Sequence, residues 1–118
     1  EHELFQRDDD NLVLDMPISF AQAALGAEID VPTLNGKSKL TIPKGTQPGT
    51  AFRIEDEGLP NLRSGRKGDL IVGVRVEVPK KMTKAQEKLL REYAASEDQA
   101  VLPETQGFWK KVKDMMNG

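Results

Sequence analysis

Hydrophobic and polar residues alternate over much of the first two thirds of the chain, which is the pattern of β-strands with one buried face. The clearest case is 69–78, where every second residue is leucine or valine: Leu70, Val72, Val74, Val76 and Val78. Because β-branched residues favour strands, this segment predicts a half-buried strand. Ile71 lies on the opposite, mostly polar face, so we expect that face to be partly covered as well.

The same alternation recurs elsewhere before Pro79. Asn35-Gly36 separates two such runs, and this pair favours a type I′ turn between antiparallel strands. Ser19 is suited to cap a short helix that ends at Leu25, with Gly26 after it. We also expect Gly58 in a turn that needs positive φ or a close backbone approach. Further strands are predicted over 3–7, 11–16, 27–32, 38–42 and 51–55.

After Val78-Pro79 the hydrophobic period becomes that of a helix. Thr83 and Gln86 have capping-box spacing, which predicts a helix over 84–96. A loop containing Pro103 is expected next, and then a last short helix of about twelve residues, which is marginal alone and must bury its apolar face. The apolar residues of this last helix are Phe108, Trp109, Val112, Met115 and Met116.

These elements predict a mainly β fold. We expect residues 1–79 to form a small two-layer β-sandwich-like domain with one short internal helix, and 80–118 to form a C-terminal helical tail. The length of 118 residues suits one compact domain or two small lobes. The β part is net acidic and the tail is net basic.

Composition excludes several classes of function. The chain has no cysteine, which rules out disulfides, thiolate zinc sites and cysteine nucleophiles, and its one histidine, His2, nearly excludes a catalytic triad. The net charge of −2 argues against a general nucleic-acid binder. No apolar run approaches the roughly 18 residues of a membrane helix, and no signal-peptide pattern opens the chain, so we expect no membrane association.

Three acidic features have a functional and a structural interpretation. Asp8-Asp9-Asp10-Asn11 has the oxygen ligands of a cation site, but these residue types also dominate ordinary turns, and we favour a turn. Glu55-Asp56-Glu57 resembles paired catalytic carboxylates, although adjacent acids alternate faces along a strand, which favours a solvated strand end. Asp69 is expected either to accept backbone N–H groups from 65–68 or to be a solvated acid.

Three further features are weaker still. Lys44-Gly45-Thr46 has only part of a phosphate-loop pattern and is interpreted as a loop. His2 lacks a nucleophile partner, so an incidental role is favoured over that of a general base. Arg63, Arg66 and Lys67 form a basic loop that is either solvated, which we favour, or contacts an acidic peptide tail of a partner.

Short motifs follow one another in a recognisable order: HELFQRD (2–8), PISFAQAALG (17–26), VPTLNG (31–36), IPKGTQPG (42–49), GLP (58–60) and GDL (68–70). In this order they resemble the second C-terminal domain of DnaJ-type J-domain co-chaperones, and the resemblance covers almost the whole chain. The His-Pro-Asp tripeptide of the J-domain and the family's Cys-x-x-Cys-x-Gly-x-Gly zinc repeats are absent. Both lie upstream in the family, and the chain begins at Glu1, so we expect a carboxy-terminal fragment.

The resemblance implies a non-catalytic homodimer that binds unfolded client polypeptides, with no cofactor and no metal. It also implies a DnaK-type heat-shock ATPase as partner, contacted through a J-domain upstream of these residues. The family's setting implies the cytoplasm, with which the absence of cysteine and of a signal peptide agrees. The family's carboxy-terminal segment docks on a second copy, which favours pairing through the last helix over folding back on its own domain. Candidate client-binding residues are Val13, Leu34, Phe52, Leu59 and Ile71.

Two alternatives remain open. The chain could be a purely structural dimerisation module with no client affinity of its own. A carboxylate-based hydrolase is a third hypothesis, but nothing in the sequence supports it.

Overall fold

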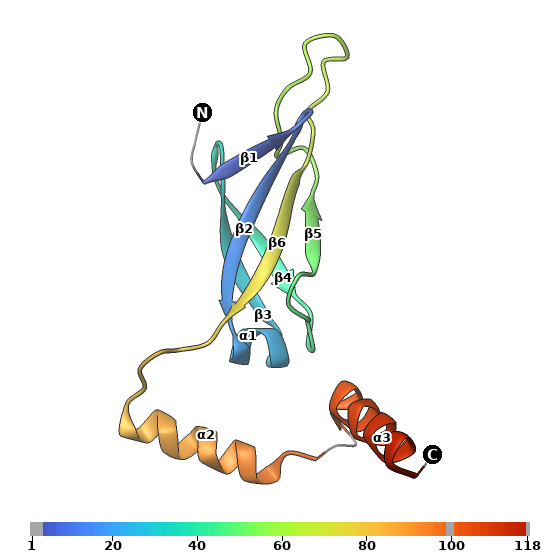
Figure 1. The fold of residues 1–118 in the computed structure, drawn as a ribbon. Coiled ribbons are helices and arrows are strands. Elements are labelled where there is room, and N and C mark those ends of the chain that lie inside the picture. The colour runs from blue at the N-terminus through green and yellow to red at the C-terminus, as the bar shows by residue number, and fades with distance from the viewer. Residues whose placement is uncertain (1–3, 99–100, 118) are drawn as a thin grey trace. The chain divides into compact units, whose positions relative to one another are not determined.

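The computed structural model describes residues 4–98 and 101–117, and Figure 1 shows their helices and strands. His2, considered above as a general base, lies outside the described residues. The chain divides into two compact units, Glu1–Val78 and Pro79–Gly118. Among the described residues, the strands lie in the first unit, and the second unit contains two helices.

A four-stranded sheet forms the larger layer of the first unit. Its strands lie in the order β1 (Phe5–Asp8), β2 (Asn11–Ser19), β6 (Leu70–Glu77) and β5 (Ala51–Ile54). The two central strands, β2 and β6, run parallel, with Leu12 opposite Leu70, whereas both edge strands pair antiparallel. Parallel strands need a long crossover connection, and the chain from α1 to β5 provides it.

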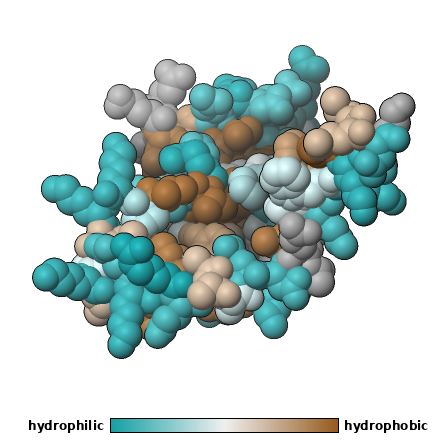
Figure 2. All heavy atoms as spheres, turned by 60° about the horizontal axis from the view of Figure 1, so that its bottom comes forward, coloured by the Kyte–Doolittle hydropathy of each residue, from teal (hydrophilic) through white to brown (hydrophobic). Residues whose placement is uncertain are grey.

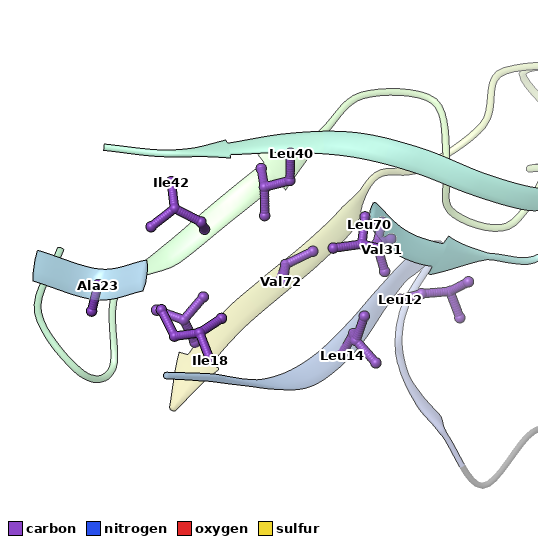
Figure 3. Close-up of a cluster of buried hydrophobic side chains, with 10 residues drawn as sticks. Leu12, Leu14, Ile18, Ala23, Val31, Leu40, Ile42, Leu70 and Val72 are labelled. Carbon is purple, nitrogen blue, oxygen red and sulfur yellow. The ribbon is translucent and has the colours of Figure 1, made fainter. Parts of the chain in front are cut away.

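The second layer is an antiparallel pair, β3 (Ala27–Thr33) and β4 (Gly36–Ile42). Figure 3 shows how side chains of the two layers meet in one hydrophobic core. Leu14, Leu70 and Val72 of the large sheet and Val31 and Ile42 of the small one are almost fully buried. The predicted mainly β fold with two layers is therefore confirmed, and burial of these apolar side chains is the main stabilising contribution.

The short helix α1 (Phe20–Leu25) is confirmed together with its caps. The Ser19 hydroxyl accepts from the Gln22 N–H at 3.0 Å, and the Gln22 side chain accepts from the Ser19 N–H at 2.9 Å. Gly26 ends the helix with φ 82°. A Cβ there would lie 3.0 Å from the Ile42 carbonyl oxygen, so the position favours glycine on both counts.

The predicted type I′ turn at Asn35-Gly36 is wrong. Thr33 pairs with Gly36, so Leu34 and Asn35 form the two-residue loop. Neither has the positive φ that a type I′ turn requires, whereas Gly36 has φ 140°. Gly36 is thus the first residue of β4 and takes up the unusual backbone conformation itself.

The second unit contains α2 (Lys84–Ser96) and α3 (Pro103–Asn117). Thr83 and Gln86 form the predicted capping box at the start of α2. The expectation of a loop around Pro103 is wrong, because Pro103 begins α3. Proline suits the first turn of a helix, where its missing N–H has no helical acceptor and its fixed φ is already helical. Neither helix has a buried residue among those described.

Candidate functional site

The outer face of the large sheet, which points away from the core, carries a small apolar centre. Val13 of β2 and Ile71 of β6 are paired in the sheet and alternate with the buried residues Leu12, Leu14 and Leu70, so they lie on the outer face. Both are half-buried, and they lie on the face opposite the one that packs against the small sheet. In the same row, Gln6 of β1 pairs with Val13 and Arg53 of β5 pairs with Ile71.

The neighbouring row of this outer face contains two small residues, Ala51 and Gly73, and the carboxylate of Asp15. Ala51 pairs with Gly73, and Gly73 pairs with Asp15. A Cβ added to Gly73 would find only the Leu14 carbonyl oxygen, at 3.9 Å. Beyond it, Arg75 donates to the Asp15 carboxylate at 3.1 Å. The apolar centre therefore has open space beside it at Gly73 and polar groups at its edges. An extended polypeptide could lie across such a surface.

The five predicted client-binding residues do not form one surface. Val13 and Ile71 lie together on the outer face. Phe52 and Leu59 are partly buried and pack against the core between the sheets. Leu34 lies in the loop between β3 and β4 and is exposed. Sequence analysis did not single out Ala51 or Gly73 as site residues. Alternation places Gly73 on the same face as Ile71, whereas the place of Ala51 beside Gly73 follows from a strand pairing that no local pattern encodes.

Several large hydrophobic side chains are exposed at the surface. Figure 2 shows hydrophobic residues, in brown, between the hydrophilic ones, in teal. In α3, Phe108 and Trp109 are 57% and 53% exposed, and Met115 and Met116 are 82% and 81% exposed. The rings of Phe108 and Trp109 meet edge to face, with centroids 5.1 Å apart. We call the set Phe108, Trp109, Val112, Met115 and Met116 the α3 stripe. Of these, Val112 is only partly exposed.

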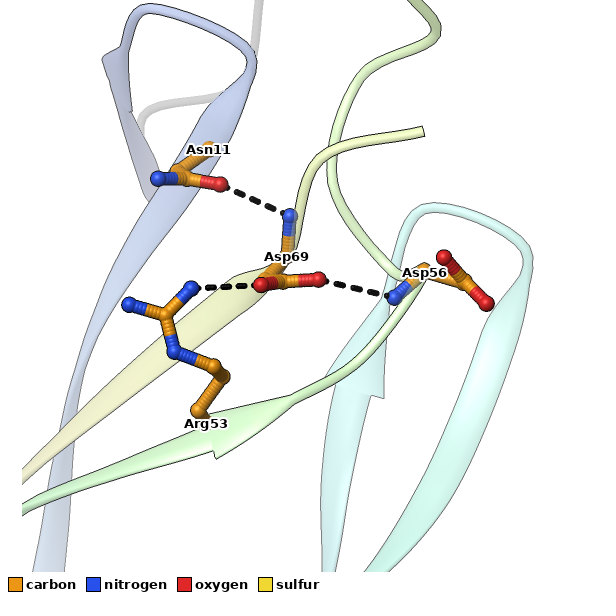
Figure 4. A network of polar contacts seen from close by, with 4 residues as sticks. All are labelled: Asn11, Arg53, Asp56 and Asp69. Carbon is orange, nitrogen blue, oxygen red and sulfur yellow. Dashed lines mark hydrogen bonds and ion pairs between the residues drawn. The ribbon is translucent and has the colours of Figure 1, made fainter. Parts of the chain in front are cut away.

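A polar network secures the sheet end where β6 begins, as Figure 4 shows. The Asp69 carboxylate accepts from the Arg53 guanidinium and, at 3.1 Å, from the Asp56 N–H. The Asp69 N–H donates to the Asn11 side-chain oxygen at 2.8 Å. The expectation that residues 65–68 supply the N–H donors is therefore wrong, because the backbone donor to the Asp69 carboxylate is Asp56.

These contacts lower the pKa of Asp69, first through the hydrogen bond from Arg53 and then through the one from Asp56. A carboxyl whose pKa is lower in the folded state stabilises that state at pH values above its unfolded pKa of about 4. The stabilisation is lost as the pH falls through the folded-state pKa.

Asp69→Asn is therefore expected to destabilise the β unit most above about pH 4, with a difference from the unsubstituted chain that shrinks in acid. Urea unfolding of both proteins between neutral and acid pH measures this difference. A difference that stays constant with pH would show that the Asp69 charge contributes nothing.

The other polar candidates have structural roles. Asp8 pairs with Asn11 across a tight turn, as predicted, and Asp10 accepts from the Asn61 side chain at 2.6 Å. The N–H groups of Gly45 and Thr46 donate to the carbonyls of Ala24 and Ala23 at the end of α1, so they are not available to cradle a phosphate. Among the residues that the structure describes, no group of three acids or histidines is placed to hold a metal ion.

The basic loop is exposed at Arg63, Arg66 and Lys67. Arg66 and Lys67 share a shallow hollow with Asp56 and Glu57, so acidic groups accompany the basic ones there. Contact with an acidic partner stays a prediction. In the described part of the chain no helix is both long and apolar enough to cross a membrane.

Comparison with known proteins decides the family. The family described as DnaJ C terminal domain matches residues 1–79. The chain belongs to the DnaJ C-terminal domain family. A second family, described as Chaperone protein DnaJ C-terminal region, matches residues 85–118, which include α2 and α3. The resemblance inferred from the motifs is thus confirmed, and the chain is a C-terminal part of a DnaJ co-chaperone.

Relatives in the DnaJ family match nearly the whole chain. Chaperone protein DnaJ of Bacillus mycoides is 55% identical over 117 residues, which are 99% of this chain and 30% of that protein. The protein of the same name from Rhodopirellula baltica is 52% identical over 113 residues, covering 96% of this chain and 29% of the relative. The chain thus spans less than a third of the length of these DnaJ proteins.

Proposed function

We propose that the chain is a non-catalytic arm of a DnaJ co-chaperone, in which the helical tail pairs two copies and the β unit holds unfolded client segments. A DnaK-type ATPase would be engaged through a J-domain elsewhere in the parent protein, in the cytoplasm. The observation that carries the proposal is the α3 stripe, because α3 has no buried residue among the described ones and four of the five stripe side chains are more than half exposed.

Pairing with a second copy would remove the α3 stripe from water. Two-fold pairing reuses the same patch on both chains, so one stripe is enough to form an interface. Aromatic residues and methionine are enriched at such interfaces, and the stripe contains Phe108, Trp109 and two methionines. Leu89, Leu90 and Tyr93 of α2 add further exposed apolar surface in the same unit.

Sedimentation equilibrium of the whole chain over a range of concentrations tests the pairing. We expect a reversible equilibrium between monomer and dimer. A monomer mass at every concentration would overturn the pairing proposal.

Client binding is supported by the outer face of the large sheet. Val13 and Ile71 offer apolar contact, and the row containing Gly73 offers open space beside them. The outer sides of β1 and β5 carry no further strand in the described sheet, so an extended segment could also pair along an edge. Each contact is small, but two arms on one dimer raise the effective client concentration without any new contact.

Val13→Ser with Ile71→Ser is expected to weaken binding of a permanently unfolded apolar polypeptide about tenfold, because two half-buried apolar side chains supply roughly 1–2 kcal/mol. Fluorescence anisotropy of the labelled polypeptide measures the affinity. The matched control is Glu28→Ser with Thr41→Ser, a paired set on the small sheet that should leave the affinity unchanged. Equal loss in both double variants would place client binding elsewhere.

One observation favours the alternative of a structural module without client affinity. The apolar centre of the outer face consists of Val13 and Ile71, and polar or charged groups surround it, among them Arg53, Asp15 and Arg75. Under this alternative the chain still forms a dimer, and it shows no saturable contact with an unfolded polypeptide.

A further inference from the structure

The last turn of α3 presents two adjacent thioethers to solvent. Met115 and Met116 are 82% and 81% exposed, and they follow Val112 by three and four positions, so both lie beside it on the α3 stripe. The other two methionines are more protected. Met16 is partly buried against the core, and Met82 is 38% exposed.

We propose that Met115 and Met116 are a reversible oxidation site that controls the pairing of two copies. This inference rests on the proposed pairing through the α3 stripe. The oxidant is hydrogen peroxide or a comparable peroxide, and susceptibility follows from the exposure of the two sulfur atoms.

The chemistry is a two-electron oxygen transfer. A lone pair of the thioether sulfur attacks one peroxide oxygen, so that an S–O bond forms while the O–O bond breaks. The sulfur is oxidised to a sulfoxide, the peroxide is reduced, and its other oxygen leaves as water with both protons. Methionine sulfoxide reductases restore the thioether, one enzyme for each sulfoxide epimer, with two electrons and two protons supplied by thiols, and the added oxygen leaves as water.

Oxidation makes the α3 stripe more polar, so that its burial in an interface becomes less favourable. A thioether is apolar and packs against aromatic rings, whereas a sulfoxide carries a strong hydrogen-bond acceptor that loses its water on burial. Each dimer would bury such groups from both copies. We therefore expect the dimer dissociation constant to rise about tenfold or more on oxidation of both residues. Pairing in turn shields the sulfurs, so oxidation should slow as the protein concentration rises.

The experiment treats the whole chain with hydrogen peroxide, locates added oxygen by peptide mass spectrometry, and measures the dissociation constant by sedimentation equilibrium. Oxidation is expected first at Met115 and Met116, together with a shift toward monomer that the reductases reverse. Met115→Leu with Met116→Leu keeps the stripe apolar and should stay paired after peroxide. The matched control Met82→Leu should respond as the unsubstituted chain does.

The outcomes separate this inference from the pairing proposal. Oxidation of both residues with an unchanged dissociation constant would overturn the inference and leave pairing intact. Equal loss of pairing in Met115→Leu with Met116→Leu would also overturn it, because the sensitive group would then lie elsewhere. A chain that is monomeric before any peroxide is added would overturn the pairing proposal itself.

Discussion

Gly68→Ala is expected to lower the free energy of unfolding of the β unit by about 3 kcal/mol or more, since a new atom has to be forced into packed backbone. A Cβ on residue 68 would lie 2.1 Å from the Asp10 carbonyl oxygen and 2.4 Å from the Asp10 carbonyl carbon. Both are backbone atoms of the turn between β1 and β2, so no side-chain rotation relieves the overlap.

Backbone hydrogen bonds also hold the segments around Gly68 and Asp10 together, so they restrict how far these segments can move apart. The Leu59 N–H donates to the Asp10 carbonyl at 2.7 Å, and the Gly58 N–H donates to the Gly68 carbonyl at 2.9 Å. A shift that made room for the Cβ would strain or break these bonds.

Urea unfolding followed by circular dichroism measures the effect. Gly73→Ala is the matched control, because Gly73 lies in β6 of the same sheet and its Cβ would meet only one atom, at 3.9 Å. The control is expected to change the free energy of unfolding by less than about 0.5 kcal/mol. Similar losses in both variants would contradict the close approach at Gly68.

Trp109→Ser with Val112→Ser is expected to raise the dimer dissociation constant about a thousandfold, because truncating buried anchor residues of an interface typically costs 2 kcal/mol or more each. Tryptophan is among the residues that most often dominate interface energies. The β unit should keep its stability, because its buried core consists of residues before Pro79.

Sedimentation velocity measures the dimer fraction, and thermal unfolding monitors the β unit. The control Lys110→Ser with Asp114→Ser changes two residues one helical turn apart on the side of α3 away from Val112, and it keeps the net charge. It should remain dimeric. An unchanged dimer in Trp109→Ser with Val112→Ser would exclude the α3 stripe as the interface.

Features set by neighbouring residues could be predicted from the sequence. The cap at Ser19 and the capping box of Thr83 and Gln86 depend only on residues within one helical turn, and both helix starts are confirmed. Alternation of apolar and polar residues located the strands, since burial of one face is a local pattern. The α3 helix was placed correctly at its apolar residues but begins earlier than expected, at Pro103.

Features that depend on distant segments could not be predicted. The parallel pairing of β2 with β6 joins strands with the whole of α1, β3, β4 and β5 between them. The close approach expected at Gly58 is confirmed, because a Cβ there would lie 2.5 Å from the Asp10 carbonyl oxygen. Gly68, where a Cβ would lie 2.1 Å from the same atom, was not singled out. The partners of Asp69 come from β5 and the turn after it, for the same reason.

The candidate client-binding residues illustrate the same limit. Alternation shows that Val13 and Phe52 each lie on one face of a strand, but it does not show which face meets the second sheet. The structure places Phe52 on the core side and Val13 on the outer side. Sequence alone therefore could not separate residues that stabilise the fold from residues available to a client.

The most direct test of the central claim is an NMR titration of the whole chain with a permanently unfolded apolar polypeptide, with the tumbling time recorded in the same sample. We predict slow tumbling of a dimer and saturable shifts clustered around Val13, Ile71 and Gly73. A chain that tumbles as a dimer and shows no saturable shift anywhere in residues 4–78 would contradict the claim and identify a scaffold without client affinity.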